Sequence, residues 1–187
     1  NKIINMEGHY GYRNLSNYNF VGEGLPLYTW YMPKYAGPNS QGQSTWYVTN
    51  ADGTQSTTTT YSQATYYLCG DANPKVYGGF GTTVSAYGFD LTASFLYSLG
   101  GKGIDYGYQT LMGSATSSSE RGNLHKDILN VWSTDNTTST IPRFQYGDEN
   151  SASMSNRFLT SNNSLTFKNI SLGYTFPRRL VEKLKLT

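Results

Sequence analysis

The chain has 187 residues and a formal net charge of +2, and only 14% of its residues are charged. It carries 17 Tyr and 20 Gly among many Ser, Thr and Asn residues, all of which have low helix propensity. This composition argues against a helical bundle and favours strands, turns and long polar loops.

The charge, cysteine and histidine content argue against several classes of function. Basic residues are scattered outside the stretch 178–185, so nucleic acid is not expected as a partner. Cys69 is the single cysteine, and His9 and His125 are the only histidines, so neither an internal disulfide nor a metal site is expected. We expect no cofactor.

No stretch reaches the ~18 apolar residues of a membrane-spanning helix. Residues 1–5 also lack the charged and apolar blocks of a signal peptide. We therefore expect either a cytosolic protein or part of a longer, processed chain.

Strand periodicity is strongest in residues 89–99, where every odd position is apolar and four of the five even positions are polar. A further strand is expected at 164–176, with its clearest alternation from 169 to 176. Pro177 ends that strand because proline cannot donate to a sheet.

Residues 76–87 form a hairpin with 89–99 if the two residues after Ala86 make a tight turn, which pairs Ala86 with Phe89. A slip of one residue would mix the two faces, so the turn and the faces predict one register. On the apolar face this register gives the pairs Val84–Leu91, Thr82–Ala93, Phe80–Phe95 and Val76–Leu99.

The connections around this hairpin alternate between very short and very long. The stretches 1–75 and 100–163 are far longer than the ~2 to 6 residues usual in compact domains. Tight turns alternating with long loops, between strands with one apolar and one polar face, are typical of an outer-membrane barrel. The apolar face would then meet lipid, and the polar face would line the interior.

Smaller elements are expected within the long connections. Residues 46–49 read as a short strand that enters a turn at 50–53. Apolar residues four apart after Asn123 predict a short amphipathic helix over 124–132. A second short helix is expected after Pro177.

Several segments in one order resemble the SusC/RagA family of TonB-dependent outer-membrane transporters. They are EGLPLY at 23–28 with AG at 36–37, NPKVYGGFG at 73–81, GFDL at 88–91, NLHKDILN at 123–130 with Trp132 and IPR at 141–143, RFL at 157–159, and KNISLGY at 168–174. Each segment alone is weak, but together they cover most of the chain.

The resemblance implies an all-β fold, as part of a transmembrane antiparallel β-barrel that has 22 strands in the family. The chain resembles the carboxy-terminal part of that barrel, without the plug domain and the TonB box. The expected division is an external loop at 1–75, the hairpin 76–87 and 89–99, an external loop at 100–163, a strand at 164–176, and a periplasmic turn at 177–187. Three strands cannot close a barrel, so we expect that the 187 residues do not fold alone.

The function implied by the resemblance is import of a nutrient, an oligosaccharide or an oligopeptide, across the bacterial outer membrane, in the manner of Bacteroidetes. Its partners would be a SusD-like surface lipoprotein over the external face, the TonB–ExbB–ExbD complex through parts missing here, and outer-membrane lipid. The chain would supply barrel wall and external loops. No enzymatic activity is implied.

Four aromatic residues in the first long loop are candidates for contact with substrate or partner: Tyr28, Trp30, Tyr31 and Trp46. Aromatic faces stack on sugar rings and pack against proteins. The alternative is that these side chains form a small core that orders the loop itself.

Two other functions remain open at this point. A secreted β-sandwich could bind glycans through Trp30, Trp46 and Trp132, and would need about seven strands with one face buried. A secreted hydrolase would need an acid/base pair, and the His125-Lys126-Asp127 run has no accompanying nucleophile.

Overall fold

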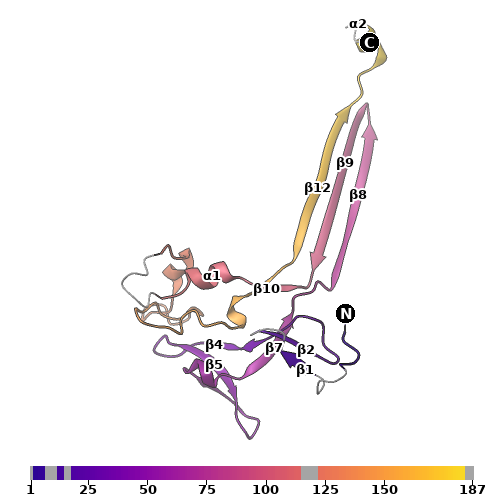
Figure 1. Cartoon of the computed structure of the whole chain (residues 1–187). Coiled ribbons are helices and arrows are strands. Elements are labelled where there is room, and N and C mark those ends of the chain that lie inside the picture. Colours follow the sequence, from indigo (N-terminus) through magenta and orange to yellow (C-terminus); the bar gives the residue numbers. More distant parts are fainter. Residues whose placement is uncertain (1, 7–11, 15–17, 115–121, 184–187) are drawn as a thin grey trace. The chain divides into compact units, whose positions relative to one another are not determined.

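The computed structural model describes residues 2–6, 12–14, 18–114 and 122–183. The chain divides into two compact units. The loop unit comprises Asn1–Asn73 and Lys102–Thr160, and the strand unit comprises Pro74–Gly101 and Ser161–Thr187. The two long connections of the sequence are therefore gathered in one unit and the long strands in the other (Figure 1).

The strand unit is an antiparallel sheet of three strands, β8 (Val76–Ala86), β9 (Phe89–Leu99) and β12 (Ser164–Tyr174), with β9 in the middle (Figure 1). The β8–β9 register is confirmed for every predicted pair. Tyr87 and Gly88 both have positive φ, at 53° and 84°. Two successive positive φ angles define the type I′ turn, whose twist matches that of a tight hairpin.

Three phenylalanine rings form a ladder across this sheet. The ring of Phe95 stacks on that of Phe80, with centroids 4.8 Å apart, and contacts the ring of Phe167 at 4.7 Å. Cross-strand aromatic pairs of this kind stabilise a sheet and fix its register. The ladder therefore marks one continuous apolar face.

A β-bulge at Lys168 keeps β12 on the same face along its length. The pairing with β9 shifts between Phe167 and Asn169, which leaves Lys168 as the extra residue. Apolar residues occupy odd positions before the bulge, ending at Phe167, and even positions after it, from Ile170. The extra residue thus returns Ile170 to the side of Phe167.

Both faces of the strand unit are exposed within the unit. Ala93 is its only buried hydrophobic side chain among the residues described, while Phe80 is 55% and Leu172 is 70% exposed. A β-sandwich would bury one face of each strand, yet β12 is exposed along its whole length. The strands therefore do not have the burial of a sandwich core.

The first segment of the loop unit contains two small sheets instead of an unstructured loop. One holds β1 (Tyr12–Asn14), β2 (Asn19–Gly22), β3 (Thr29–Pro33) and β7 (Tyr66–Asp71), and the other holds β4 (Tyr35–Pro38), β5 (Ser44–Thr49) and β6 (Gln55–Thr58). The predicted strand at 46–49 and its turn are confirmed as the β5–β6 hairpin. The sequence does not predict the other strands of these sheets, because they are short and show no regular alternation of apolar and polar residues.

The second half of the loop unit is built from short elements. They are β10 (Lys102–Ile104), α1 (Tyr106–Leu111), the 3-10 helices η2 (Lys126–Asn130) and η3 (Asn156–Phe158), and β11 (Leu159–Ser161), which pairs with β10. A further 3-10 helix, η1 (Tyr61–Gln63), precedes β7.

The amphipathic helix expected at 124–132 is wrong. Only η2 forms there, capped by His125, and the chain becomes extended at Val131. Leu129 is 88% exposed, so the segment buries no helical apolar face. The helix expected after Pro177 is confirmed as α2 (Arg178–Lys183).

The core of the loop unit joins its two chain segments. Met32 and Trp46 from the first segment and Phe158 from the second are at most 2% exposed. The Tyr61 hydroxyl donates a hydrogen bond of 2.6 Å to the Met154 carbonyl, which adds a polar link between the segments. The two long connections thus form one folded body.

None of the helices in the described part of the chain is long and apolar enough to cross a membrane.

Candidate functional site

The four aromatic candidates lie in different surroundings. Trp46 is 1% exposed, and its ring meets that of Tyr61 edge-on at 5.2 Å. Tyr28 is 47% exposed and has a positive φ of 61°. Trp46 therefore belongs to the core of the loop unit, whereas Tyr28 presents its ring to the surface.

Tyr31 and Trp30 are partly buried on neighbouring positions of β3. The Tyr31 ring lies 4.9 Å from that of Phe20 and 5.4 Å from that of Tyr66. Trp30 donates from Nε1 to the carbonyl of Lys102 at 2.9 Å. Both side chains hold elements of the loop unit together, and a contact with substrate or partner by Tyr28, Trp30 or Tyr31 stays a prediction.

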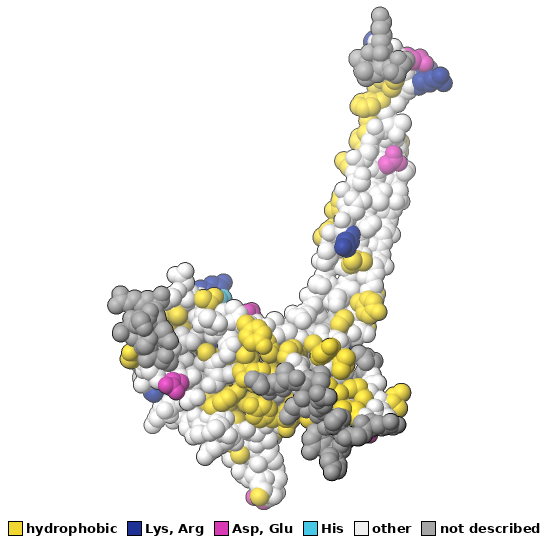
Figure 2. Space-filling model, viewed as in Figure 1, with side chains coloured by type: hydrophobic (Ala, Val, Ile, Leu, Met, Phe, Trp, Pro, Cys, Tyr) yellow, Lys and Arg dark blue, Asp and Glu magenta, His cyan; other side chains and the backbone are white. Residues whose placement is uncertain are grey.

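Hydrophobic side chains gather on the viewed face of the loop unit, where charged side chains are sparse (Figure 2). Leu27, Tyr28, Tyr66 and Leu68 are among the exposed large hydrophobic residues of this unit. Large exposed apolar areas are typical of contact surfaces.

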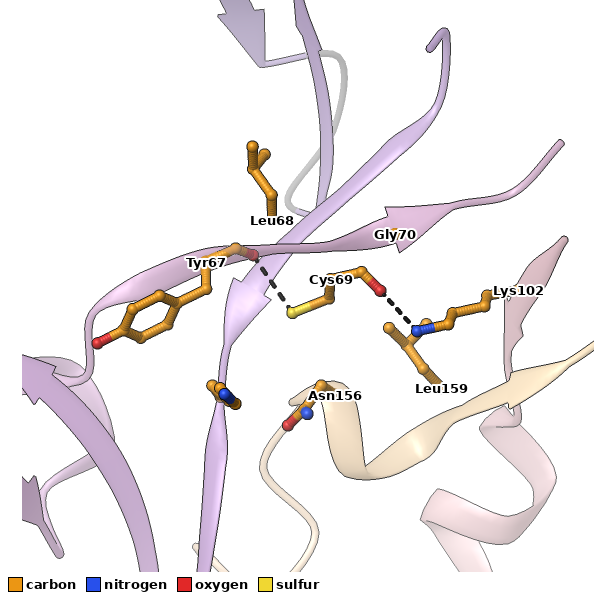
Figure 3. A pocket seen from close by; sticks show the side chains of 8 residues that line it. Tyr67, Leu68, Cys69, Gly70, Lys102, Asn156 and Leu159 are labelled. Carbon is orange, nitrogen blue, oxygen red and sulfur yellow. Dashed lines mark hydrogen bonds between the residues drawn. The ribbon is translucent and has the colours of Figure 1, made fainter. Parts of the chain in front are cut away.

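A pocket of about 420 Å³ opens within the loop unit, around Cys69 (Figure 3). Its walls come from the β3–β4 connection, β7, β10, η3 and β11. The lining residues are Lys34, Tyr67, Leu68, Cys69, Gly70, Lys102, Asn156 and Leu159.

Hydrogen bonds fix three of the groups in this pocket, and Figure 3 draws those of Lys102 and of the Cys69 thiol. Lys102 donates from Nζ to the carbonyl of Cys69 at 3.0 Å, and the Cys69 thiol donates to the carbonyl of Tyr67 at 3.3 Å. The amide oxygen of Asn156 accepts from the backbone N–H of Tyr35 at 2.8 Å.

The pKa of the Cys69 thiol is raised because burial disfavours the thiolate, and the ammonium groups of Lys102 and Lys34 oppose that rise. Both lysines therefore act electrostatically on the same sulfur atom. Sequence analysis missed this pocket because its residues come from separate segments and no motif joins them.

A partly buried arginine, Arg157, lies on η3 next to the pocket residue Asn156. Arg157 lies over the rings of Tyr35 and Phe158, at 5.4 Å and 5.1 Å from their centroids, and donates from Nη1 to the carbonyl of Ser151 at 3.0 Å. Burial lowers the pKa of Arg157 and raises the pKa of Tyr35 to about 12. Cation–π contacts of this kind anchor elements in a unit that has few ion pairs.

His125 and Asp127 hold a local turn. The Nδ1 atom of His125 accepts from the Asp127 backbone N–H at 3.2 Å, and the Tyr108 hydroxyl donates to the Asp127 carboxylate at 3.1 Å. These contacts stabilise the turn around η2.

The polar face of the strand unit carries a hollow of about 470 Å³. Tyr77, Gly79 and Leu96 line it, and Gly79 is the cross-strand partner of Leu96. A Cβ at Gly79 would come within 2.9 Å of the Leu96 side chain. Ser98, Ser164 and Thr166 add hydroxyl groups to the lining.

The long two-faced strands and the large loop unit are the features of an outer-membrane β-barrel transporter. A TonB-dependent receptor, P3, of Formosa agariphila is 27% identical to the chain over 125 residues, which cover 67% of the chain. No family model matches the chain.

Solved structures give the same assignment over nearly the whole chain. One chain of the RagAB peptide importer in its closed-closed state superposes with a TM-score of 0.78 and 27% identity, covering 96% of this chain. A second structure of the RagAB peptide transporter gives a TM-score of 0.74 and 26% identity over the same share.

By these likenesses the chain is similar to one part of TonB-dependent transporters of the bacterial outer membrane. The likeness to the RagAB structures agrees with the resemblance to the SusC/RagA family that the sequence segments carry. The chain spans 12% of the length of the receptor from Formosa agariphila and 20% of each RagAB chain.

Proposed function

We propose that the chain supplies barrel wall and external loops to a TonB-dependent importer of oligosaccharides or oligopeptides. The observation that carries the proposal is the strand unit, with its phenylalanine ladder on one face and its glycine and hydroxyl residues on the other. An apolar band toward lipid and a polar interior are what a membrane-spanning barrel requires. β8, β9 and β12 are three neighbouring strands of that barrel.

The loop unit lies outside the cell in this proposal. Periplasmic turns of such barrels are short and extracellular loops are long, which matches the two-residue turn between β8 and β9 and the size of the loop unit. The hydrophobic face of the loop unit then contacts a SusD-like surface lipoprotein. The energy for import comes from the TonB–ExbB–ExbD complex acting on the plug. The likeness to the RagAB peptide importer supports this arrangement.

Peptide tags in the full-length transporter test the orientation. One tag is inserted in the exposed turn at Asp52–Gly53, and the other at Tyr87–Gly88. Antibody added to intact cells is expected to stain the first and not the second. Staining of the second alone would reverse the orientation and place the loop unit in the periplasm.

Uptake by cells that lack the transporter gene tests the import itself. Labelled oligopeptides and oligosaccharides are offered in parallel to wild-type, deleted and complemented cells, each with and without TonB. We expect one cargo class to enter only with both the transporter and TonB. Unchanged uptake of both classes in the deleted strain would contradict the proposal.

A further inference from the structure

The pocket around Cys69 is rich in hydrogen-bond donors and poor in acceptors. Lys34 and Lys102 each bring an ammonium group, which has three N–H donors and no acceptor. Lys102 uses one donor on the Cys69 carbonyl. Asn156 has its amide oxygen occupied by the Tyr35 N–H, so its NH₂ group remains to serve the pocket.

The two ammonium groups have no carboxylate partner in the part of the chain that the structure describes. The ion pair between permanently charged side chains there is Arg178–Glu182, and no acidic residue lines the pocket. The Lys34 ammonium makes a cation–π contact, with its Nζ 5.3 Å from the centre of the Tyr47 ring. The pocket therefore carries two uncompensated positive charges.

The charges act on one place rather than on two separate surfaces. Both ammonium groups influence the same Cys69 thiol, and Figure 3 shows the Lys102 amine and the Asn156 amide close to that residue. Like charges held around one concavity raise the local concentration of anions. A volume of about 420 Å³ is within the range of small-ligand pockets and suits one side chain or one sugar unit.

We propose that this pocket binds a carboxylate carried by the cargo, either on an acidic peptide or on an acidic sugar. The lysine ammonium groups would pair with the carboxylate oxygens, and the Asn156 amide would donate to one of them. This inference rests on the proposed function, because it takes the anion to be part of an imported molecule. The importer would thereby prefer acidic cargo over its neutral counterpart.

Cys69 is a built-in reporter for the test. In the purified full-length transporter, with any other cysteine changed to serine, its thiol is modified by an anionic and by a cationic thiosulfonate reagent of similar size. The ratio of the two rates reports the local potential and cancels changes in accessibility. We expect K34Q/K102Q to lower the anionic-to-cationic ratio by roughly tenfold. The matched control K126Q removes an exposed lysine elsewhere in the loop unit and is expected to leave the ratio unchanged.

Binding is then measured as protection of Cys69 from a neutral thiol reagent. The probes are a capped alternating alanine–glutamate hexapeptide, its glutamine counterpart, tetragalacturonate, and the methyl ester of tetragalacturonate. We expect protection by one of the two acidic probes, lost in K34Q/K102Q and kept in K126Q, and the protecting probe identifies the source of the carboxylate.

Two results would overturn the proposal: a rate ratio that K34Q/K102Q leaves unchanged, or absence of protection by both acidic probes. Protection by neutral and acidic probes alike would also count against it. None of these measurements requires energised transport. A failure of the anion pocket is therefore distinguishable from a failure of import.

Discussion

The loop unit and the strand unit bury their side chains in different ways. The loop unit encloses Met32, Trp46 and Phe158 almost completely, whereas Ala93 is the one buried hydrophobic side chain described in the strand unit. A folded body with its own core is expected to persist wherever it is attached. An open sheet with unpaired edges depends on neighbouring strands and on lipid. The comparison shows that the long connections in this chain are folded parts, and it leads us to expect that its most regular strands are the dependent ones.

The largest expected effect comes from the loop-unit core. W46A removes a nearly fully buried indole and is expected to cost about 3–5 kcal/mol of local stability. L129A, at a side chain that is 88% exposed, is the control and should change stability by less than about 0.5 kcal/mol. Hydrogen exchange of the full-length transporter should show lost protection in the loop unit and unchanged protection in β8, β9 and β12. Equal loss of protection in the loop unit and in the three strands would mean that the two units unfold together.

The next effect concerns the apolar face of the strand unit. F95R places a charge in the phenylalanine ladder and is expected to cost ~2–4 kcal/mol in a lipid-embedded barrel, while S94R on the opposite face should cost much less. Urea unfolding of the full-length transporter in vesicles measures both. Equal losses would remove the assignment of lipid and interior faces.

A smaller effect on stability is expected from alanine substitutions at two glycines of the loop unit, one closely packed and one in open space. Gly42 and Gly53 have similar positive φ angles, 77° and 81°, so alanine is strained at both. At Gly42 a Cβ would also lie 2.3 Å from the Trp132 ring, whereas at Gly53 nothing lies within 4 Å.

G42A is therefore expected to cost about 1–3 kcal/mol more than G53A, because overpacking adds to the backbone strain. Limited proteolysis of the loop unit in the full-length transporter measures the difference. Identical cleavage of the two variants would show that Trp132 does not pack on Gly42.

Regular strands were predictable from sequence, and the reason is visible in β8 and β9. Alternation over eleven residues, joined by a turn with glycine at its second position, leaves one register that keeps both faces intact. The bulge at Lys168 also has a sequence signal, because the apolar positions change from odd to even between Phe167 and Ile170. The prediction of one regular strand at 164–176 did not include this bulge.

The loop unit was beyond such rules because its order comes from contacts between distant segments. Lys34, Cys69, Lys102 and Asn156 line one pocket from four separate stretches of chain, with no spacing that could connect them. The aromatic residues predicted to contact substrate or partner lie in different surroundings, which the sequence does not distinguish. Trp46 lies in the core and Tyr28 on the surface, and only tertiary packing distinguishes them.

The smallest expected effect is a pH dependence confined to the loop unit. Burial raises the pKa of Tyr35 to about 12, from its ordinary value of 10.0, and its hydroxyl donates to the Thr140 carbonyl at 3.1 Å. The folded state therefore keeps this proton at a pH where the unfolded state has lost it. The stability linked to Tyr35 is complete below pH 10 and decreases as the pH rises toward 12.

Y35F removes this titration at the cost of one hydrogen bond, a loss of about 1 kcal/mol that does not depend on pH. The pKa of Tyr61 is also raised by burial, so some alkaline sensitivity of the loop unit persists in the variant. Tyrosinate absorbance of the full-length transporter, wild type minus Y35F, should show one ionisation with a midpoint near pH 12. A midpoint near 10 would mean that water reaches the Tyr35 hydroxyl, and the contrast between a closed loop-unit core and an open strand sheet would be weaker than the structure indicates.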